Sequence, residues 1–385
     1  MRIRFGRTAA LGLTSAILFT GAGLVAGAGG AGAASSAKSY EVMVVGTLTG
    51  SAAYTTPEIV AATEGAFRGV NGAKIITCDD QGSSSQATAC EHEAVVDHVA
   101  AVIVGANSYV GQNESLLTQA GIPAIGVTDA TSSDSFAVES SAGVYAGIGV
   151  GLAKAGCHRL GILYIDGTQF LSNAIIGGGK WQSVTEAPVA LNAPDLTPSI
   201  AKLAEAKVQC VAISVEPNTV IQAMTAIKQD DLKVKVAMVS ALVDPQVLSA
   251  LGSEANGIIS IEGQVDPASK APVNAEIKSD MKAIDPKQPL TTAAILAWAS
   301  AKLVIDAVPS ITGPVTAASM MKALNGLRNA STDGALPPFS AIPLKNPAYA
   351  RFFNHYAIDY VIENGLPKQL TGFYDLTSAL DKKSK

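Results

Sequence analysis

Short, wholly apolar runs alternate along this chain with stretches in which apolar residues recur at helical spacing. Residues 101–104 and 122–127 are apolar at nearly every position, which is typical of strands buried on both faces of a sheet. Between them, residues 111–120 carry two adjacent leucines on a polar surface and are followed by Gly121, the residue type that commonly ends helices. The pattern therefore predicts a strand–helix–strand unit.

The same alternation extends over most of the chain in two series. In the first, we expect strands at 40–47, 73–77, 101–104 and 122–127 and helices at 57–70, 85–99 and 111–120. In the second series, we expect strands at 159–165, 211–215, 234–239 and 257–261 and helices at 143–155, 198–207, 220–227 and 245–251. In the tail, we expect helices at 273–283, 291–308 and 317–324 and a hairpin turn at Asn364-Gly365. Short connections favour parallel, right-handed, doubly wound α/β sheets, so two such lobes around a cleft are predicted.

Small polar residues follow both strands of the opening unit. Residues 105–108 and 128–131 are rich in Gly, Asn, Ser, Thr and Asp, which favour turns and offer hydrogen bonds. In open α/β sheets, ligands bind outside the carboxyl ends of the strands. We therefore expect a small-molecule site at these two loops, with no chemistry performed on the bound molecule.

The first 33 residues have the three parts of a secretory signal peptide. Arg2, Arg4 and Arg7 give a basic start, residues 9–25 are apolar, and Ala31-Gly32-Ala33 is a small-residue cleavage site. A membrane anchor is the alternative, which the short and glycine-rich apolar run disfavours. Because no cysteine lies near the cleavage site, no lipid anchor is expected. We predict a cleaved, secreted or extracytoplasmic protein of the cell envelope.

Composition narrows the classes of function. Removal of 33 of 385 residues leaves 352, enough for two domains. The signal segment carries three arginines and no acid, so the net charge of −5 becomes −8. With this acidic balance and no basic stripe with interleaved aromatic residues, nucleic-acid binding has no support. We expect a monomer.

Four cysteines in an exported protein predict two disulfides, for which three pairings are possible. Cys78 ends a predicted strand and Cys90 lies in the next helix, a local and reachable pair. Cys157 and Cys210 each precede a predicted strand, so they meet if these strands are parallel neighbours. We favour 78–90 with 157–210. A thiolate nucleophile or a metal site is disfavoured because no CxxC motif occurs and only four histidines accompany the cysteines.

Six segments, in this order and spacing, resemble one family. They read VVGTLTGSAAY, CDDQGSSSQATACEHEAVVD, VIVGANS, IPAIGVTDAT, DPQVLSALGSEANGIIS and AAILAWASAKLVIDAV. From Tyr40 to about Leu376 the chain is similar to type I periplasmic binding proteins, specifically the branched-chain amino acid (Leu/Ile/Val) receptors of ABC transporters. The resemblance implies two lobes joined by a hinge of three crossovers, lobe I at 40–141 plus 265–340 and lobe II at 142–264 plus 341–376, with a tail at 377–385.

The resemblance also implies a set of ligand-binding residues, an ABC permease as partner and hinge closure around one small solute. In lobe I, a first-loop aromatic residue forms a wall, the loop near 107–109 holds a ligand carboxylate, and the loop at 128–130 faces it. Lobe II contributes the loops after three strands, and one late aromatic residue lies near the hinge. The residues are Tyr54, Asn107, Ser108, Tyr109, Thr128, Asp129, Ala130, Gln169, Phe170, Glu216, Ser240 and Trp298.

One departure from the family bears on the ligand. Amino-acid receptors of this family place an acid near 240–242 to pair with the ligand ammonium, and this chain has Ser-Ala-Leu there. Because a buried ammonium without a carboxylate is costly, an ordinary amino acid is disfavoured unless Glu216 or Asp129 replaces that acid. We expect a carboxylate, an amide or a bulkier organic solute instead.

No enzyme signature, cofactor motif or metal motif is recognised. Residues 147–151 (GIGVG) resemble part of a dinucleotide fingerprint but fall in a predicted helix, where glycines serve close packing. Ser108 lies outside any G-x-S-x-G elbow. The alternatives to a transport receptor are a ligand sensor that presents its solute to a membrane receptor and an amide hydrolase on the same fold.

Overall fold

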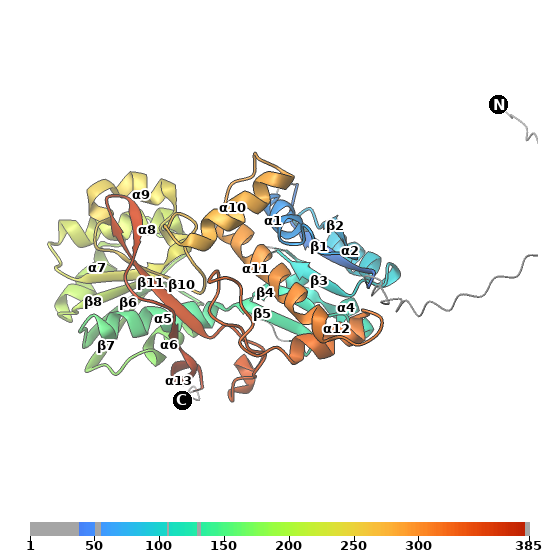
Figure 1. The fold of residues 1–385 in the computed structure, drawn as a ribbon. Helices are drawn as coiled ribbons and strands as arrows, with labels where there is room; N and C mark the ends of the chain where they lie inside the picture. The colour runs from blue at the N-terminus through green and yellow to red at the C-terminus, as the bar shows by residue number, and fades with distance from the viewer. Residues whose placement is uncertain (1–37, 51–54, 106–107, 129–131, 382–385) are drawn as a thin grey trace, which may run out of the picture. The chain divides into compact units, whose positions relative to one another are not determined.

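The computed structural model describes residues 38–50, 55–105, 108–128 and 132–381. The expected signal peptide, residues 1–33, lies outside these ranges. Within them the strands form two sheets, and helices cover both faces of each (Figure 1). The predicted fold class, two α/β lobes with parallel sheet cores, is confirmed.

The first sheet has the strand order β2-β1-β3-β4-β5, and all of its pairs are parallel. Its strands are β1 (Tyr40–Gly46), β2 (Ala73–Asp79), β3 (Ala101–Val104), β4 (Ala124–Thr128) and β5 (Ser135–Glu139). Its helices are α1 (Glu58–Ala66), α2 (Ser84–Val96), α3 (Val110–Asn113), α4 (Ser115–Ala120), α10 (Pro272–Ile284), α11 (Thr292–Ala307) and α12 (Ala317–Asn325). We call this sheet with these helices lobe I.

The second sheet has the order β12-β11-β10-β9-β8-β6-β7, with β13 paired to β11. Its strands are β6 (Arg159–Ile165), β7 (Ser183–Val189), β8 (Cys210–Ser214), β9 (Lys235–Val239), β10 (Ile259–Glu262), β11 (Tyr356–Glu363), β12 (Leu366–Gln369) and β13 (Tyr374–Asp375). Its helices are α5 (Ser141–Lys154), α6 (Gln169–Gly177), α7 (Thr197–Glu205), α8 (Pro217–Gln229), α9 (Pro245–Leu251) and α13 (Thr377–Leu380). We call this sheet with these helices lobe II.

The strands from β6 to β10 pair in parallel, whereas β11 runs antiparallel to β10 and continues through a tight turn into β12. Asn364 and Gly365 form that turn with φ values of 53° and 74°. Positive φ at both central residues is the requirement of a type I′ hairpin turn, which Asn-Gly meets best. The predicted hairpin turn is therefore confirmed.

The differences from the prediction include two strands and one break in a helix. β5 follows β4 without an intervening helix, so a pattern in which strands alternate with helices did not predict it. β7 is an edge strand of mixed polarity (SVTEAPV) whose burial is incomplete, so it has no apolar run. The single helix expected at 111–120 is two short helices, α3 and α4, separated by Glu114 at φ 26°.

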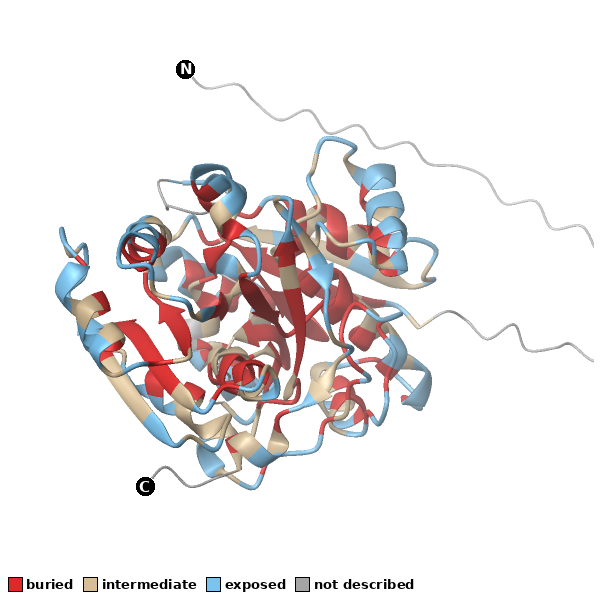
Figure 2. Cartoon of the chain, turned by 90° about the vertical axis from the view of Figure 1, so that its left-hand side faces the viewer, coloured by how far each residue is buried: buried red, intermediate tan, exposed pale blue. Residues whose placement is uncertain are grey.

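Buried residues lie on both faces of the sheets. Most of the strands are buried and therefore red in Figure 2. α11 is the central helix of lobe I and packs against α1. Among the described residues, only the segment Thr292–Ser310 is long and apolar enough to cross a membrane. Most of it is buried inside lobe I, and Trp298 is fully buried, so α11 is the core helix of a folded lobe.

Three connections join the two lobes. The first is residue 140, between β5 and α5; the second is residues 263–271, between β10 and α10; the third is residues 326–355, between α12 and β11. Their number matches the three crossovers expected from the family resemblance, and their action as a hinge stays a prediction. The exact lobe boundaries proposed from the sequence stay a prediction.

Candidate functional site

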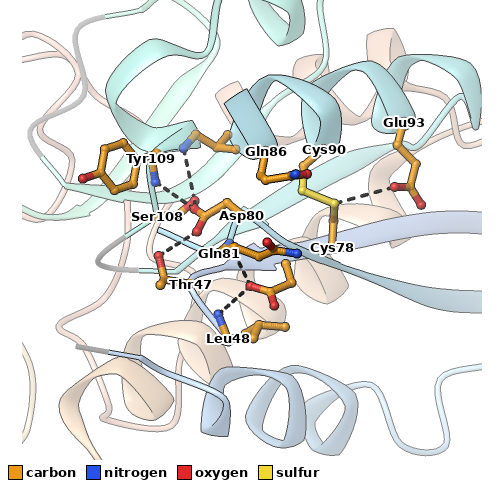
Figure 3. Close-up of a disulfide and its surroundings, with 12 residues drawn as sticks. Thr47, Leu48, Cys78, Asp80, Gln81, Gln86, Cys90, Glu93, Ser108 and Tyr109 are labelled. Carbon is orange, nitrogen blue, oxygen red and sulfur yellow. Dashed lines mark hydrogen bonds between the residues drawn. A yellow bond between two sulfur atoms is a disulfide. The ribbon is translucent and has the colours of Figure 1, made fainter. Parts of the chain in front are cut away.

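The carboxyl ends of β1, β2 and β3 are tied together by one buried carboxylate. Asp80 directly follows β2 and is fully buried. Its carboxylate accepts hydrogen bonds from the hydroxyls of Thr47 (2.7 Å) and Ser108 (2.7 Å) and from the backbone N–H groups of Tyr109 (2.8 Å) and Gly82 (3.0 Å), as Figure 3 shows for the first three. Asp80 therefore fixes the loops after β1 and β3 relative to each other.

The preceding carboxylate fixes the start of the loop after β1 in the same way. Asp79 accepts hydrogen bonds from the N–H groups of Leu48 (3.0 Å), Thr49 (3.3 Å) and Gln81 (2.9 Å) and from the Thr49 hydroxyl. Burial alone raises the pKa of Asp79, but these hydrogen bonds outweigh it and lower the pKa below the ordinary value. The carboxylate form thus holds the backbone that leads into the candidate ligand loop.

Ser108 and Tyr109, both expected in the ligand site, take part in this arrangement. The Ser108 hydroxyl donates to Asp80 and accepts a hydrogen bond from the N–H of Val110 (3.2 Å), where α3 begins. Ser108 is buried, so its hydroxyl positions the loop here. A direct contact between Ser108 or Tyr109 and a solute stays a prediction.

A disulfide between β2 and α2 stabilises the same region (Figure 3). Cys78 in β2 is bonded to Cys90 in α2, with the two Cα atoms 5.7 Å apart. The second disulfide, Cys157–Cys210, joins the connection just before β6 to the start of β8 with a Cα separation of 6.1 Å. β6 and β8 are parallel neighbours, as this pairing requires. Both predicted disulfides are confirmed.

In lobe II, the candidates Gln169 and Phe170 begin α6. Gln169 accepts a hydrogen bond from the Tyr164 hydroxyl and donates to Glu186, which also accepts from the Ser172 hydroxyl (2.5 Å). These contacts hold the first turn of α6 against β6 and β7. Phe170 is 62% exposed and offers an apolar surface beside the fixed polar groups.

The other candidates lie where other strands end. Thr128 is the half-buried last residue of β4. Glu216 follows β8 by two residues and caps α8 through its backbone, and the Thr219 hydroxyl lies 3.4 Å from its carboxylate. Ser240 follows β9 directly. Since β8 and β9 are parallel neighbours, Glu216 and Ser240 lie at the same edge of the lobe II sheet.

The structure adds an acid beside Ser240 that the sequence analysis missed. Glu262 ends β10, the neighbour of β9, and its buried carboxyl group hydrogen-bonds with Ser240, Gln264 and Asp266. Burial, followed by the charge of Asp266, raises the pKa of Glu262 well above the ordinary value. The sequence signal that could have identified Glu262 is its position directly after a predicted strand.

Trp298 does not join this group. Trp298 is fully buried in the core of lobe I, where its indole N–H donates to Asp280 (3.0 Å), so it packs the lobe. Within the part of the chain that the structure describes, no cluster of three His, Cys, Asp or Glu residues could hold a metal ion. The candidates that lie outside the described residues are Tyr54, Asn107, Asp129 and Ala130.

Comparison with known proteins gives a family and several structural relatives. A family model described as periplasmic binding protein matches residues 39–343. A fatty acid ABC transporter substrate-binding protein from Thermomonospora curvata is 16% identical, with a TM-score of 0.67 over 90% of this chain and 95% of that one.

Two further structures share the fold. A leucine binding protein from Thermotoga maritima is 14% identical, with a TM-score of 0.64 over 87% of this chain and 99% of that one. A solute binding protein of an ABC transporter from Rhodopseudomonas palustris, in complex with 3,4-dihydroxybenzoic acid, is 18% identical, with a TM-score of 0.62 over 88% and 98% of the two chains. No curated protein sequence matches this chain.

Proposed function

Because this chain belongs to the periplasmic binding protein family, we propose that it captures a small organic solute outside the cytoplasm and delivers it to an ABC importer. Members of the family bind small molecules in an extracytoplasmic location and work with ABC transporters. The observation that carries the proposal is the pair of lobe I loops held by Asp80 at the carboxyl ends of β1 and β3. Such loop ends are where parallel α/β sheets bind ligands.

Closure of the two lobes is the proposed mode of capture. Three chain connections join the lobes, and residues in such connections act as hinges in two-lobed receptors. The lobe I loops and the lobe II groups at Gln169, Phe170 and Ser240 then form the two sides of the site. Capture by closure needs no chemical step, so the proposed protein is a receptor and not an enzyme.

A carboxylate or a bulkier solute is the proposed ligand class. The acid nearest to Ser240 is Glu262, which is buried and whose raised pKa favours the neutral form, so it is a poor partner for an ammonium group. Exposed Phe170 suits an apolar part of the solute. One structural relative is named as a fatty acid substrate-binding protein, and another is a solute binding protein in complex with 3,4-dihydroxybenzoic acid. Both names are consistent with this ligand class.

The test is a thermal-shift panel on residues 34–385, with the signal peptide removed. The panel contains amino acids, amides, fatty acids and aromatic carboxylates. A solute at about 100 times its dissociation constant adds roughly 2.7 kcal/mol to the unfolding free energy, which raises Tm by a few degrees. A hit among carboxylates supports the proposed class, whereas a hit confined to amino acids overturns it and points to Glu216 or Asp129 as the partner of the ammonium.

Small-angle scattering on the same protein tests closure. The radius of gyration should decrease when the solute found in the panel is added. A proven binder that leaves the radius unchanged would contradict closure while leaving solute binding intact. Failure of every solute in the panel, in a protein that folds, would count against the receptor function itself.

A further inference from the structure

One buried side-chain amide in the third connection bonds to backbone at the start of the second connection and to backbone just before the first. Asn354 lies near the end of the third connection and is 5% exposed. Its Nδ2 atom donates hydrogen bonds to the carbonyl oxygens of Val138 (2.8 Å) and Gly263 (2.8 Å). Val138 lies in β5 just before the first connection, and Gly263 opens the second. A single NH₂ group therefore bridges backbone from lobe I and lobe II.

The segment that precedes Asn354 is fixed against lobe I. Phe352 forms an isolated β-bridge with Ala137 in β5. The guanidinium of Arg351 donates from Nε to the carbonyl of Ser135 (2.8 Å) and lies 4.6 Å from the ring of Phe136. After Asn354 the chain enters β11 of lobe II. The amide thus lies where the third connection leaves one lobe for the other.

Few side chains can replace this amide. The two carbonyl groups belong to residues 125 positions apart in the chain, and each needs a donor because a buried carbonyl without a partner costs about 1–3 kcal/mol. An NH₂ group supplies two donors from one atom, which fixes the separation of its two acceptors. A hydroxyl supplies one donor, and a carboxylate supplies none.

We infer that Asn354 is the pivot of the hinge, a positioning residue that sets the angle between the lobes in the solute-free protein. Movement of the lobes turns the backbone at the three connections, so a contact that holds these connections together determines which orientations are available. The consequence for affinity rests on the proposed function, because apparent affinity follows the fraction of protein in the binding-competent orientation. The effect on the lobe angle does not depend on any solute.

A matched pair of variants separates a pivot from an ordinary buried hydrogen-bond donor. Asn354→Ala removes the bridge. Ser300→Ala removes another buried donor, 0% exposed, whose hydroxyl donates to the carbonyl of Leu296 (2.8 Å). Both residues of this control bond lie within α11, away from the three connections. Both variants should lose thermal stability, but only Asn354→Ala breaks contacts between connections.

The readout is the distance distribution between two spin labels in the solute-free protein, measured by pulsed electron resonance. Labels are attached to cysteines introduced at His92 in α2 and Gln222 in α8, two exposed positions on different lobes. We expect Asn354→Ala to shift or broaden the distribution, Ser300→Ala to match the wild type, and the milder Asn354→Ser to fall between Asn354→Ala and the wild type. An unchanged distribution in Asn354→Ser and Asn354→Ala would overturn the pivot.

Solute affinity gives a second and independent readout. If a solute in the panel binds, Asn354→Ala should change its Kd several-fold and Ser300→Ala should not. Unchanged affinity and an unchanged label distribution would overturn the pivot while the receptor function stands. A shifted distribution without any binder in the panel would support the pivot and count against the proposed function.

Discussion

At the scale of single residues, Asp80 is the clearest case of a side chain that organises the candidate site. It accepts four hydrogen bonds from three loops and is fully buried. Asp80→Asn keeps its size but places an NH₂ group against these donors. We expect a loss of about 2–4 kcal/mol in the free energy of unfolding, since hydrogen bonds to charged groups contribute roughly 1.5–3 kcal/mol each and part of the network survives.

Urea denaturation of the wild type and the variant measures this loss. Asp306→Asn is the control because Asp306 is exposed on α11, and surface changes of this kind stay within about 0.5 kcal/mol. Solute affinity should also fall for Asp80→Asn, since the loops after β1 and β3 lose their common support. Equal effects of the two substitutions would show that Asp80 does not hold the loops.

Glu114 is a second residue whose surroundings lead to a prediction. Burial raises its pKa to about 7, the Ser135 hydroxyl lowers it in part, and the charges of Asp134 and Glu91 raise it further. The Arg351 guanidinium interacts with the charge of Asp134, which in turn acts on Glu114. Because the folded-state pKa lies above the unfolded value, the contribution of Glu114 to stability is complete below about pH 4.5 and is lost as the pH rises to about 7.

Glu114→Gln removes this pH-dependent contribution. The difference in unfolding free energy between variant and wild type should therefore shift in favour of the variant between about pH 5 and pH 7.5. Denaturation at several pH values measures the difference, and Glu205→Gln at the exposed end of α7 is the control. Parallel curves for wild type and Glu114→Gln would contradict the raised pKa.

At the scale of elements, two helices of lobe II approach each other through glycines. A Cβ atom on Gly149 of α5 would lie 2.0 Å from the carbonyl oxygen of Ile175 in α6, closer than any real contact. A Cβ atom on Gly178 would lie 2.3 Å from the carbonyl oxygen of Ala146. The glycines at 147–151 thus serve close helix packing, as the sequence pattern indicated.

Gly149→Ala should therefore destabilise lobe II by about 1–3 kcal/mol or more, the usual cost of overpacking. Gly177→Ala is the control, because a Cβ atom there meets only the Ala379 carbonyl oxygen at an ordinary 3.6 Å. The control should leave the unfolding free energy within about 0.5 kcal/mol of the wild type. Thermal or urea denaturation gives both values, and a harmless Gly149→Ala would show that α5 and α6 can separate freely.

The helices and strands also show which parts of the fold the sequence pattern could predict. Strands buried on both faces, such as β1, β3 and β6, carry continuous apolar runs and were predicted with nearly the observed bounds. β7 was missed because an edge strand needs no such run. The break at Glu114 was missed because its carboxyl group bonds with Ser135, 21 residues away, a contact that helical periodicity does not contain.

At the scale of the whole molecule, each lobe carries one disulfide, and the two should contribute differently. The Cys157–Cys210 bond has a sequence separation of 53 and the Cys78–Cys90 bond one of 12. By the loop-entropy model, their removal costs about 4 and about 3 kcal/mol, respectively. Paired substitution to alanine, followed by denaturation, measures these losses.

The two disulfides should differ more in function than in stability. Cys78 directly precedes Asp79 and Asp80, so its loss frees the segment that holds the lobe I loops. Cys157 and Cys210 lie at the opposite, amino-terminal edge of the lobe II sheet. We expect the loss of Cys78–Cys90 to weaken solute binding and the loss of Cys157–Cys210 to spare it. The reverse order would place the solute away from the Asp80 loops.

The sequence by itself determined whatever depends on local order along the chain. Apolar runs and helical periodicity specified the two α/β series, and Asn364-Gly365 specified a hairpin turn because few residues tolerate two positive φ angles. The disulfide pairing was favoured from the same order on the condition that the strands next to Cys157 and Cys210 are parallel neighbours, and the structure meets that condition.

Only the tertiary structure decided which polar groups meet. Asp80 bonds with Ser108 across 28 residues, and Asn354 bonds with Val138 across 216. Glu262 meets Ser240 because β10 and β9 are paired. Such contacts depend on how strands align and lobes connect, and buried polar groups select partners by proximity in space, which no local pattern records.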